Sequence, residues 1–502
     1  MIVIEYIKGI DYIYIMDVYC SLINKSPNIL VIGDVMLDKY INCIVNRYSK
    51  ETDIPILDTQ YITYKLGGAA NVCNNIKQLG FSCTLISIVG EDEERNNILD
   101  LLREKDIDHH IEIIKNRPTT IKTRIYNSSR QVVRYDCESR NKIENDIESK
   151  LYEYIQKNLT KYNGIIISDY QKGCITDSLC KNIISLARKF NINVLIDAKN
   201  NDNNKLSGCT LFKPNRPEFE AMTNYTITDP NCCDFQRIIK ELATSITCSF
   251  LLVTMDKLGF MLYDCYNSSF YHIPTSNSNT ELQFMDTCGA GDTIISMISL
   301  VLLLFNNDND CIEKYLKFVE RCADSVIRKV GTSTISFEDI LTISKKDDFL
   351  LSYDHLGIIH DMNKIMNKRI LFTNGCFDIL HSGHIDFLTE CKKKCDIFIL
   401  GLNSDESIQE NKGDKRPIIP LKQRIYNLQA LKLMDFIVVF DDKTPSSIIE
   451  RLKPTILAKG DKDYTIDNIV GRENAEQTIV ISTKEYYDTT KIINTIVNNY
   501  CK

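Results

Sequence analysis

The stretch FTNGCFDILHSGHIDFL, Phe372 to Leu388, indicates how the C-terminal part of the chain folds and what it binds. A short apolar run ends in a glycine turn, and His381 and His384 follow, although the whole chain has only seven histidines. A strand that turns into a helix brings backbone N–H groups and the positive end of the helix dipole to one point. The pattern therefore predicts a nucleotide-phosphate site, where two imidazoles can donate to α-phosphate oxygens as pyrophosphate leaves.

Two other interpretations of this histidine pair stay open. Side chains three positions apart lie on one face of a helix, so both can reach a metal ion. No third ligand stands nearby in the sequence, which argues against a metal. The pair can also belong to the core or cap the following helix.

A second candidate phosphate site is DTCGAGDT, Asp286 to Thr293, followed by the apolar run TIISMISLVLLLF. Gly289 and Gly291 allow backbone N–H groups to approach a ligand at the start of the predicted helix. Such a nest stabilises charge on a transferred phosphoryl group, and Asp292 is placed to act as general base on an attacking hydroxyl. A structural glycine turn explains the same letters.

Composition limits the class of protein. The chain has 502 residues, enough for roughly two to four domains, and its 44% hydrophobic and 25% charged residues are typical of globular proteins. A net charge of -7 without a basic half argues against a nucleic-acid partner. No apolar run of ~18 residues predicts a membrane span, and no signal peptide is evident. The 19 cysteines are scattered, which favours reduced thiols in the cytoplasm.

Short apolar runs separated by helix-like segments predict an α/β fold. The runs begin at Ile29, Thr84, Gly164, Asn193, Thr210 and Phe250 and are rich in β-branched residues. This is typical of strands buried on both faces of a parallel sheet. Ligands bind at the carboxyl ends of such strands, where the chain places Asp34, Asp169, Asp197, Asn215 and Thr254.

Between Arg117 and Glu138 the pattern changes to a period of two residues. TIKTRIY alternates, NSSR can turn, and QVVRY follows, so we expect a β-hairpin. Lys122 and Arg124 would share one face of its first strand. That face can cover an anionic sugar, or it can be a solvated edge.

A charged, non-periodic stretch near Lys345 to Tyr353 separates two series of strands. The second series comprises RILFTNG, DIFILGLN, DFIVVF, ILAKGD and TIVIS, five predicted strands in a compact domain. We therefore predict a leader of unknown role over residues 1–27, a first domain over 28–344, a linker with a leading helix over 345–368, and a second domain over 369–502.

The two halves resemble two known families. The first half resembles the ribokinase-like sugar kinases in five motifs: GDVMLD, which contains Asp34 and Asp38, and GGAANV, DAK, NRPE and GAGD. No Walker-type phosphate loop occurs in the chain. TNGCFD with HSGH, KGDKRP and DTTKII resembles the HxGH nucleotidyltransferases, which have a Rossmann-type, cytidylyltransferase-like fold. Their order along the chain resembles the bifunctional enzymes of ADP-heptose biosynthesis.

This resemblance implies two reactions. The first half would phosphorylate D-glycero-β-D-manno-heptose 7-phosphate at C1 with ATP and Mg²⁺, beneath a hairpin lid. The second would transfer AMP from ATP to heptose 1-phosphate and release pyrophosphate. A separate phosphatase would act between them, and a homodimer through the kinase lid is possible for such enzymes.

The resemblance also implies roles for individual residues. In the first half, Asp292 would be the base and the amides of Gly289, Ala290 and Gly291 the anion hole. ATP would contact Asn215, Arg216, Pro217 and Glu218, of which Glu218 also faces the metal. The sugar phosphate would be held by Asp34, Asp38, Gly67, Gly68, Asn71, Lys122, Arg124, Asp169, Asp197 and Lys199.

In the second half, the resemblance makes His381 and His384 the catalytic pair. The remaining nucleotide contacts would be Thr373, Asn374, Gly375, Phe377, Lys412, Arg416, Asp488, Thr489 and Thr490, with Arg424 downstream of the basic loop. Cys288, Ala198 and the KGDKDY loop at Lys459 depart from the family patterns.

Two alternatives compete with this interpretation. The chain can run the same two chemistries on another sugar phosphate, or with CTP. It can also be a non-catalytic scaffold derived from such an enzyme, although Asp292 and both histidines are retained.

Overall fold

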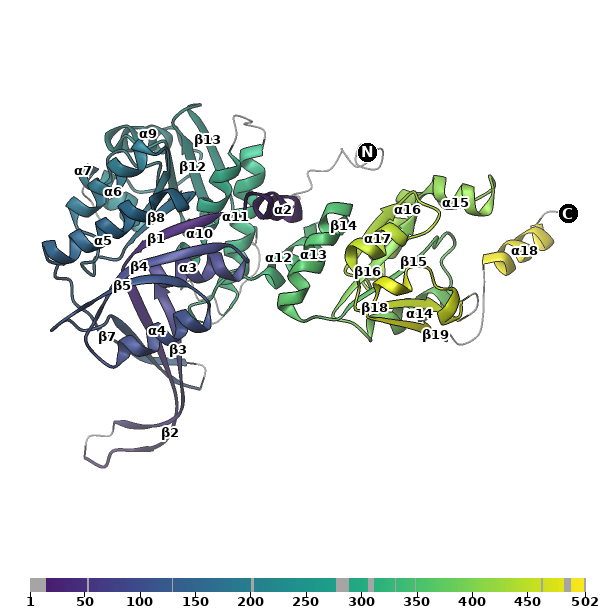
Figure 1. The fold of residues 1–502 in the computed structure, drawn as a ribbon, viewed down its shortest axis with the longest axis horizontal. Coiled ribbons are helices and arrows are strands. Elements are labelled where there is room, and N and C mark those ends of the chain that lie inside the picture. Colours follow the sequence, from purple (N-terminus) through teal and green to yellow (C-terminus); the bar gives the residue numbers. More distant parts are fainter. Residues whose placement is uncertain are drawn as a thin grey trace. The chain divides into compact units, whose positions relative to one another are not determined.

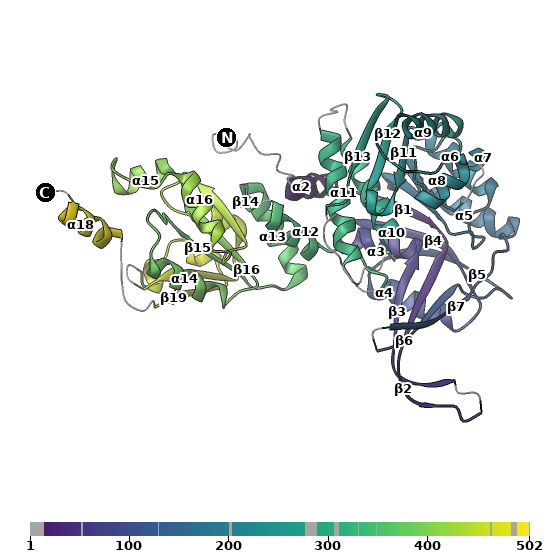
Figure 2. The ribbon, with the colours of Figure 1, turned by 180° about the vertical axis from the view of Figure 1, so that it is seen from behind.

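A computed structural model of the chain describes residues 15–51, 54–128, 130–199, 203–276, 289–305, 311–329, 331–347, 349–461, 464–482 and 489–500. The chain forms two compact units (Figures 1 and 2). We call Ser21–Ile340 the N-terminal unit, and Met1–Cys20 together with Leu341–Lys502 the C-terminal unit. The domain limits predicted from the sequence stay predictions.

A nine-stranded sheet organises the N-terminal unit, in the order β13-β12-β11-β10-β9-β8-β1-β4-β5. The apolar runs form its parallel centre, which confirms the predicted α/β fold: β1 (Asn28–Gly33), β4 (Ser82–Gly90), β8 (Gly164–Asp169), β9 (Asn193–Ala198), β10 (Leu211–Phe212) and β11 (Phe250–Thr254). The edges, which were not predicted, are β5 (Asp108–Ile114) and the antiparallel β12 (Phe260–Asp264) and β13 (Ser269–Ile273).

Helices cover this sheet, and one of them is buried on every side. In α10 (Ala290–Val301) each residue from Asp292 onward is buried. A helix that is apolar all round must lie inside a protein, and α10 packs against α3 (Ala69–Gln78) and α11 (Ile312–Ile327). Other covering helices are α4 (Glu94–Glu104), α5 (Asn145–Asn158), α6 (Asp177–Lys189), α7 (Asn203–Leu206), α8 (Arg216–Thr223) and α9 (Cys233–Ile246).

A separate four-stranded sheet, β3-β2-β6-β7, forms the lid and extends away from the large sheet (Figure 1). The predicted hairpin is present as β6 (Ile121–Asn127) and β7 (Arg130–Cys137), which pair antiparallel. Two longer strands, β2 (Val35–Tyr48) and β3 (Pro55–Gly68), were not predicted. Their outer parts carry exposed side chains, so they lack the continuous apolar run of a buried strand.

The C-terminal unit contains a six-stranded parallel sheet in the order β14-β17-β16-β15-β18-β19. Its five predicted strands are β15 (Ile370–Gly375), β16 (Ile397–Asn403), β17 (Phe436–Phe440), β18 (Ile456–Gly460) and β19 (Gln477–Ile481), and the short β14 (Leu350–Leu351) falls in the predicted linker. The helices are α13 (Tyr353–Met366), α14 (Ser382–Lys392), α15 (Asp405–Lys412), α16 (Leu421–Ala430), α17 (Ser446–Leu452) and α18 (Thr489–Tyr500).

Two helices lie where the division falls: α2 (Ile15–Lys25), inside the predicted leader, and α12 (Phe337–Asp347). Within the C-terminal unit, Asp17 of α2 accepts a hydrogen bond from Nε2 of His355 at 2.8 Å. All cysteines in the described ranges are free. None of the described helices has the length and apolar character needed to cross a membrane.

Candidate active sites

In the N-terminal unit, the Asp292 carboxylate lies at the start of α10 between two donors from other elements. Nδ2 of Asn71, on α3, donates to one carboxylate oxygen at 2.7 Å. The Tyr170 hydroxyl, just beyond β8, donates to the other at 2.6 Å. Strand β8 and helices α3 and α10 thus converge on one carboxylate, at the edge where parallel strands bind ligands.

Burial sets the protonation of this carboxylate. Asp292 is 5% exposed, and removal from water raises its pKa to about 6, with the nearby negative charge of Asp197 adding to the rise. The hydrogen bonds from Tyr170 and Asn71 oppose the shift, as does the positive charge of Lys213. A carboxylate with a pKa near 6 is ionised at neutral pH and still basic enough to accept a hydroxyl proton.

The glycine turn before α10 requires a conformation that only glycine adopts easily. Gly289 has φ 93°, and a β-carbon there would lie 2.9 Å from the carbonyl oxygen of Ser333. The turn leaves the first N–H groups of α10 without intrahelical partners, because a helix satisfies its N–H groups only from the fifth residue on. Ala290 and Gly291 are therefore positioned to present N–H groups to an anion.

Lys213, immediately after β10, is a charged residue of this site that the sequence analysis did not identify. Its side chain is 3% exposed, and its Nζ lies 2.9 Å from the Asp197 carboxylate. The sequence pattern that could have identified Lys213 is the one that identified Asp197: a polar residue directly after a buried strand. Tyr170 was missed likewise, although it directly follows Asp169 in the sequence.

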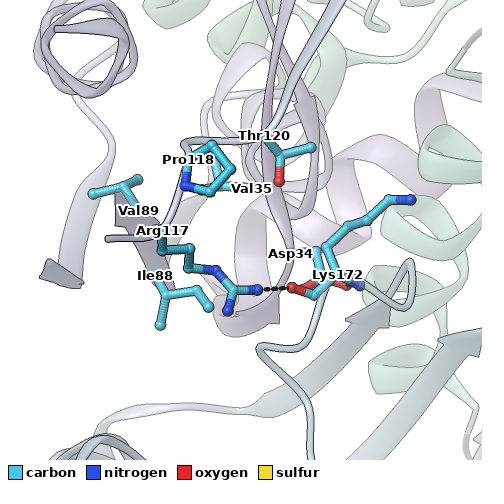
Figure 3. A pocket seen from close by; sticks show the side chains of 8 residues that line it. All are labelled: Asp34, Val35, Ile88, Val89, Arg117, Pro118, Thr120 and Lys172. Carbon is cyan, nitrogen blue, oxygen red and sulfur yellow. Dashed lines mark hydrogen bonds between the residues drawn. The ribbon is translucent and has the colours of Figure 1, made fainter. Parts of the chain in front are cut away.

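Asp34 and Asp169 use their carboxylates to hold the chain itself. Asp34 accepts hydrogen bonds from the N–H groups of Tyr170, Lys172 and Cys174; burial raises its pKa to about 6. Arg117 points toward Asp34 and Lys172 in Figure 3. Asp169 forms a buried ion pair with Lys205 at 2.6 Å. The predicted sugar contacts of both aspartates stay proposals.

The lid contributes a buried ion pair and one cation that faces an aromatic ring. Arg124 lies 2.6 Å from Asp38, and the other oxygen of Asp38 accepts from Thr332 at 2.6 Å. Lys122 places its Nζ 5.4 Å from the centre of the Tyr170 ring, and burial lowers its pKa. Arg124 is therefore paired with a carboxylate and Lys122 faces an aromatic ring, although both residues lie on one face of β6.

A second lysine near the Tyr170 ring and the turn between β3 and α3 complete this end of the site. Lys199 places its Nζ 5.0 Å from the Tyr170 ring centre. A β-carbon on Gly67 would lie 2.6 Å from the Asp38 carboxylate, and one on Gly68, where φ is 58°, would lie 2.3 Å from the Asp34 carbonyl oxygen. Both glycines therefore permit close approach of β2 and β3.

The NRPE motif caps α8. The Asn215 side chain accepts from the N–H of Glu218 at 2.9 Å, and the Glu218 carboxylate accepts from the N–H of Asn215 at 2.8 Å. Pro217 lies in the first turn, and Arg216 pairs with Glu220 at 3.0 Å. Burial raises the pKa of Glu218. The motif thus has a structural role of its own beside any nucleotide contact.

In the C-terminal unit, His381 and His384 stack at the start of α14. Their ring centres are 3.8 Å apart. Burial, together with the positive charges of His381 and Lys412, lowers the pKa of His384 to about 4. Its buried Nδ1 has no hydrogen-bond partner among the described residues. Two rings this close cannot both carry charge in the absence of an anion.

The turn that follows β15 lies against these rings. Phe377 has φ 45°, and its ring centre is 5.1 Å from that of His384. A β-carbon on Gly375 would lie 2.8 Å from the Phe377 ring. Thr373 is buried and donates to the carbonyl oxygen of Ala458 at 2.8 Å, which ties β15 to β18.

Lys459, at the end of β18, is a second cation that the sequence analysis did not assign. Its Nζ donates to the carbonyl oxygen of Asn374 at 3.1 Å and also to Oδ1 of that residue. Burial lowers the pKa of Lys459 to about 8. Lys459 belongs to the KGDKDY loop. This loop was predicted to depart from the family pattern, but its lysine was given no role.

The predicted basic loop is anchored by Asp378. Arg416 donates to the Asp378 carboxylate at 2.6 Å, and the N–H groups of Ile418 and Ile419 donate to it as well. Lys412 ends α15 and is exposed. Arg424 is fully buried: it donates to three carbonyl oxygens and to Asp405. It therefore holds this region together through contacts with the chain itself.

The last predicted contacts lie at the start of α18. Thr489 is its first residue and Thr490 its second. Asp488 falls outside the described residues. Within the described ranges, no three side chains of His, Cys, Asp or Glu gather as metal ligands, so the histidine pair has no third protein ligand there.

Comparisons with known proteins agree with this two-site architecture. Residues 26–339 match the model of the pfkB family of carbohydrate kinases, and residues 372–495 match the cytidylyltransferase-like model. Phosphofructokinase-2 from Escherichia coli, solved with potassium, superposes with a TM-score of 0.52 at 20% identity, covering 63% of this chain and 98% of that one. This likeness shows the fold of the N-terminal unit.

Relatives also span both units. The bifunctional protein HldE of Aliarcobacter butzleri is 34% identical over 95% of this chain and 99% of its own length. Those of Helicobacter acinonychis and Geobacter sulfurreducens are each 36% identical over 94% of this chain, and over 99% and 96% of their own lengths. The chain is a sugar kinase joined to a nucleotidyltransferase, and it belongs to the family of bifunctional HldE proteins.

Proposed function

We propose that the chain catalyses two steps in the synthesis of ADP-heptose. The N-terminal unit phosphorylates D-glycero-β-D-manno-heptose 7-phosphate at C1, and the C-terminal unit joins AMP from ATP to heptose 1-phosphate. The observation that carries this proposal is that one chain holds both a buried carboxylate at a glycine turn, Asp292, and a stacked histidine pair, His381 and His384.

In the kinase step, the C1 hydroxyl oxygen attacks the γ-phosphorus of ATP. A new O–P bond forms, the bond from that phosphorus to the β–γ bridging oxygen breaks, and the electron pair leaves with ADP. Asp292 takes the hydroxyl proton, since its buried carboxylate is ionised at neutral pH. The N–H groups of Gly289, Ala290 and Gly291 stabilise charge on the transferred group.

Other residues of the N-terminal unit position the two substrates. Asn71 and Tyr170 orient the Asp292 carboxylate through their hydrogen bonds. Lys122 and Lys199, on the Tyr170 ring, attract the sugar phosphate. The predicted sugar and nucleotide contacts of Asp34, Asp38, Arg124, Asp169, Asp197, Asn215 and Arg216 belong to this proposal.

A magnesium ion fits this site only together with the nucleotide. Mg²⁺ is commonly held by one or two carboxylates plus substrate phosphates, and the described residues provide no cluster of three ligands. Glu218 would be the protein ligand, because only one of its carboxylate oxygens is used in the α8 cap. When bound, the ion neutralises charge on the phosphates.

In the nucleotidyl step, an oxygen of the sugar 1-phosphate attacks the α-phosphorus of ATP, and pyrophosphate leaves. The imidazoles of His381 and His384 donate to the oxygens of the α-phosphate as charge develops. Asn374, Gly375 and Phe377 shape the turn beside them. Lys412, Arg416 and the start of α18 attract the triphosphate.

The proposal extends to partners and compartment. A separate phosphatase must act between the steps, since the first product carries a phosphate at C7 that the second substrate lacks. A homodimer through the lid is supported by exposed apolar residues of β2, β3 and β7, including Ile44, Tyr61 and Val133. The free cysteines of the described ranges fit a reducing, cytoplasmic compartment.

The test supplies the purified chain with ATP, Mg²⁺ and heptose 7-phosphate, and identifies products by mass spectrometry. We expect heptose 1,7-bisphosphate and ADP. A second reaction with heptose 1-phosphate and ATP should give ADP-heptose and pyrophosphate, and parallel reactions with CTP and with other sugar phosphates should be much slower. Absence of both products from a folded chain would favour the scaffold interpretation.

A further inference from the structure

We propose that Lys213 is a catalytic residue of the kinase site, whose ammonium group contacts the phosphoryl group while it is transferred. This inference rests on the proposed function and adds a residue to it. It starts from the position of Lys213 at the carboxyl end of β10, where its side chain is 3% exposed. A cation buried this deeply is costly unless charged groups surround it.

The surroundings of Lys213 are those of a phosphate cradle. Its Nζ lies 2.9 Å from the Asp197 carboxylate. Burial disfavours the charged form of Lys213, but the negative charges of Asp197, Glu218 and Asp292 outweigh burial and raise its pKa. The position of a β-carbon on Gly291 would be 3.7 Å from Nζ. The ammonium group thus adjoins the glycine turn where N–H groups of α10 are exposed to an anion.

The hydrogen-bonding capacity of Lys213 exceeds what its partner uses. An ammonium group has three N–H donors, and among the described residues the Asp197 carboxylate is the partner of this one. Three carboxylates near one ammonium leave an excess of negative charge, so a simple counter-ion role for Lys213 would be incomplete. A nucleotide triphosphate with its metal brings both acceptors for the remaining donors and compensating positive charge.

The position of Lys213 matters because negative charge moves on the phosphoryl group during its transfer. Negative charge is spread over the three equatorial oxygens of the transferred group. A donor fixed between Gly291 and Asp197 is held in place before reaction, so it need not reorganise as charge moves. Lys213 would then act together with the N–H groups of the turn, while Asp292 removes the proton from the opposite reactant.

Lys213→Met in the full-length chain tests this inference by kinase kinetics. Removal of one preorganised donor should lower kcat about a hundredfold, with KM for the sugar phosphate little changed. Inhibition by ADP with aluminium fluoride, which imitates the transferred group, should weaken strongly, whereas inhibition by ADP alone should change little. Lys77→Met, which breaks a surface pair with Asp106 at 2.8 Å, is the matched control and should behave as wild type.

A structural role would give a different pattern. If Lys213 only balances Asp197, Lys213→Met should weaken both inhibitors equally, and the double variant Lys213→Met/Asp197→Asn, which leaves no unpaired carboxylate, should turn over as fast as Asp197→Asn alone. Either result overturns the inference. If Lys213→Met does not fold, the double variant replaces it in the test, and a kcat about a hundredfold below that of Asp197→Asn alone supports the inference.

The inference and the proposed function fail in distinguishable ways. A wild-type chain that phosphorylates no sugar phosphate overturns the proposed function, and Lys213 loses its role with it. A wild-type chain that is active, with Lys213→Met equally active, overturns only the role of Lys213.

Discussion

The two active sites shift the pKa values of their central groups in opposite directions by the same means. In the kinase site, burial raises the pKa of the Asp292 carboxylate to about 6. In the nucleotidyltransferase site, burial lowers the pKa of the His384 imidazole to about 4. Both shifts favour the neutral form of the group, because a low-dielectric environment disfavours charge of either sign.

The two groups are also held in place in different ways. Asp292 is held by side chains from two distant elements, Asn71 and Tyr170, with Lys213 nearby. The histidine pair is held mainly by its own turn and by the stacking of the two rings. The Asp292 carboxylate is therefore oriented by both of its oxygens, whereas the buried Nδ1 of His384 has no hydrogen-bond partner among the described residues.

The largest effect should come from Asp292→Asn. The amide keeps the size of the side chain but cannot take the hydroxyl proton, and general-base catalysis contributes about 10²–10⁴-fold. We expect kinase kcat to fall by that factor with little change in KM for ATP. Nucleotidyl transfer to supplied heptose 1-phosphate is the internal control and should continue at the wild-type rate. Retention of more than about a tenth of kinase turnover would point to another base, such as Asp197.

His384→Ala should produce the next largest effect, confined to the other reaction. Loss of one positioned donor lowers turnover about a hundredfold or more, so ADP-heptose formation should nearly stop while sugar phosphorylation continues. His360→Ala, on α13 of the same unit, is the matched control and should leave both rates unchanged. A parallel loss of kinase activity in His384→Ala would contradict the hypothesis that the two sites act independently.

Lys122→Met tests how the lid holds the sugar phosphate. A hydrogen bond to a charged group contributes about 1.5–3 kcal/mol, so KM for the sugar phosphate should rise roughly tenfold to a hundredfold, and KM for ATP should not. Lys115→Met, at an exposed position of the same unit, serves as control. Equal changes in both KM values would mean that β6 is a solvated edge strand that does not bind the sugar phosphate.

Arg124→Met is expected to act on stability more than on binding. It leaves the buried Asp38 carboxylate without its cation, and breaking a buried pair in this way costs about 3–5 kcal/mol. The free energy of unfolding, measured in denaturant, should fall by that amount, whereas Lys122→Met should change it little. A stable Arg124→Met variant with a raised KM would assign Arg124 to the sugar phosphate instead.

The smallest change at neutral pH should follow Tyr170→Phe. Asp292 must be ionised to act, so kinase kcat in the wild type should fall as pH drops below about 6. The Tyr170 hydrogen bond stabilises the ionised form, and its removal raises the pKa of Asp292 further. The acid limb of the pH profile should therefore move upward by roughly one pH unit. A limb that stays in place would show that a different group controls it.

Much of the fold followed from local patterns. The β-branched runs of β1, β8 and β15 are buried on both faces, so their sequence alone predicts them. The lid strands β2 and β3 were missed, because one part of each is buried against the protein and the rest is exposed. Charged residues such as Lys213 and Lys459 were missed because a lysine after a strand is usually solvated.

The sequence by itself determined the two families and the order of the two units, and it is the source of the prediction that Asp292, His381 and His384 are catalytic. These depend on motifs that lie within a few residues of each other. Only the tertiary structure showed how charged groups that lie far apart in the sequence are paired: Asp34, Asp169 and Arg424 hold other parts of the chain, and Lys213 pairs with Asp197 beside the glycine turn of α10. The physical reason is that burial and pairing depend on residues far apart in sequence, which local patterns do not specify.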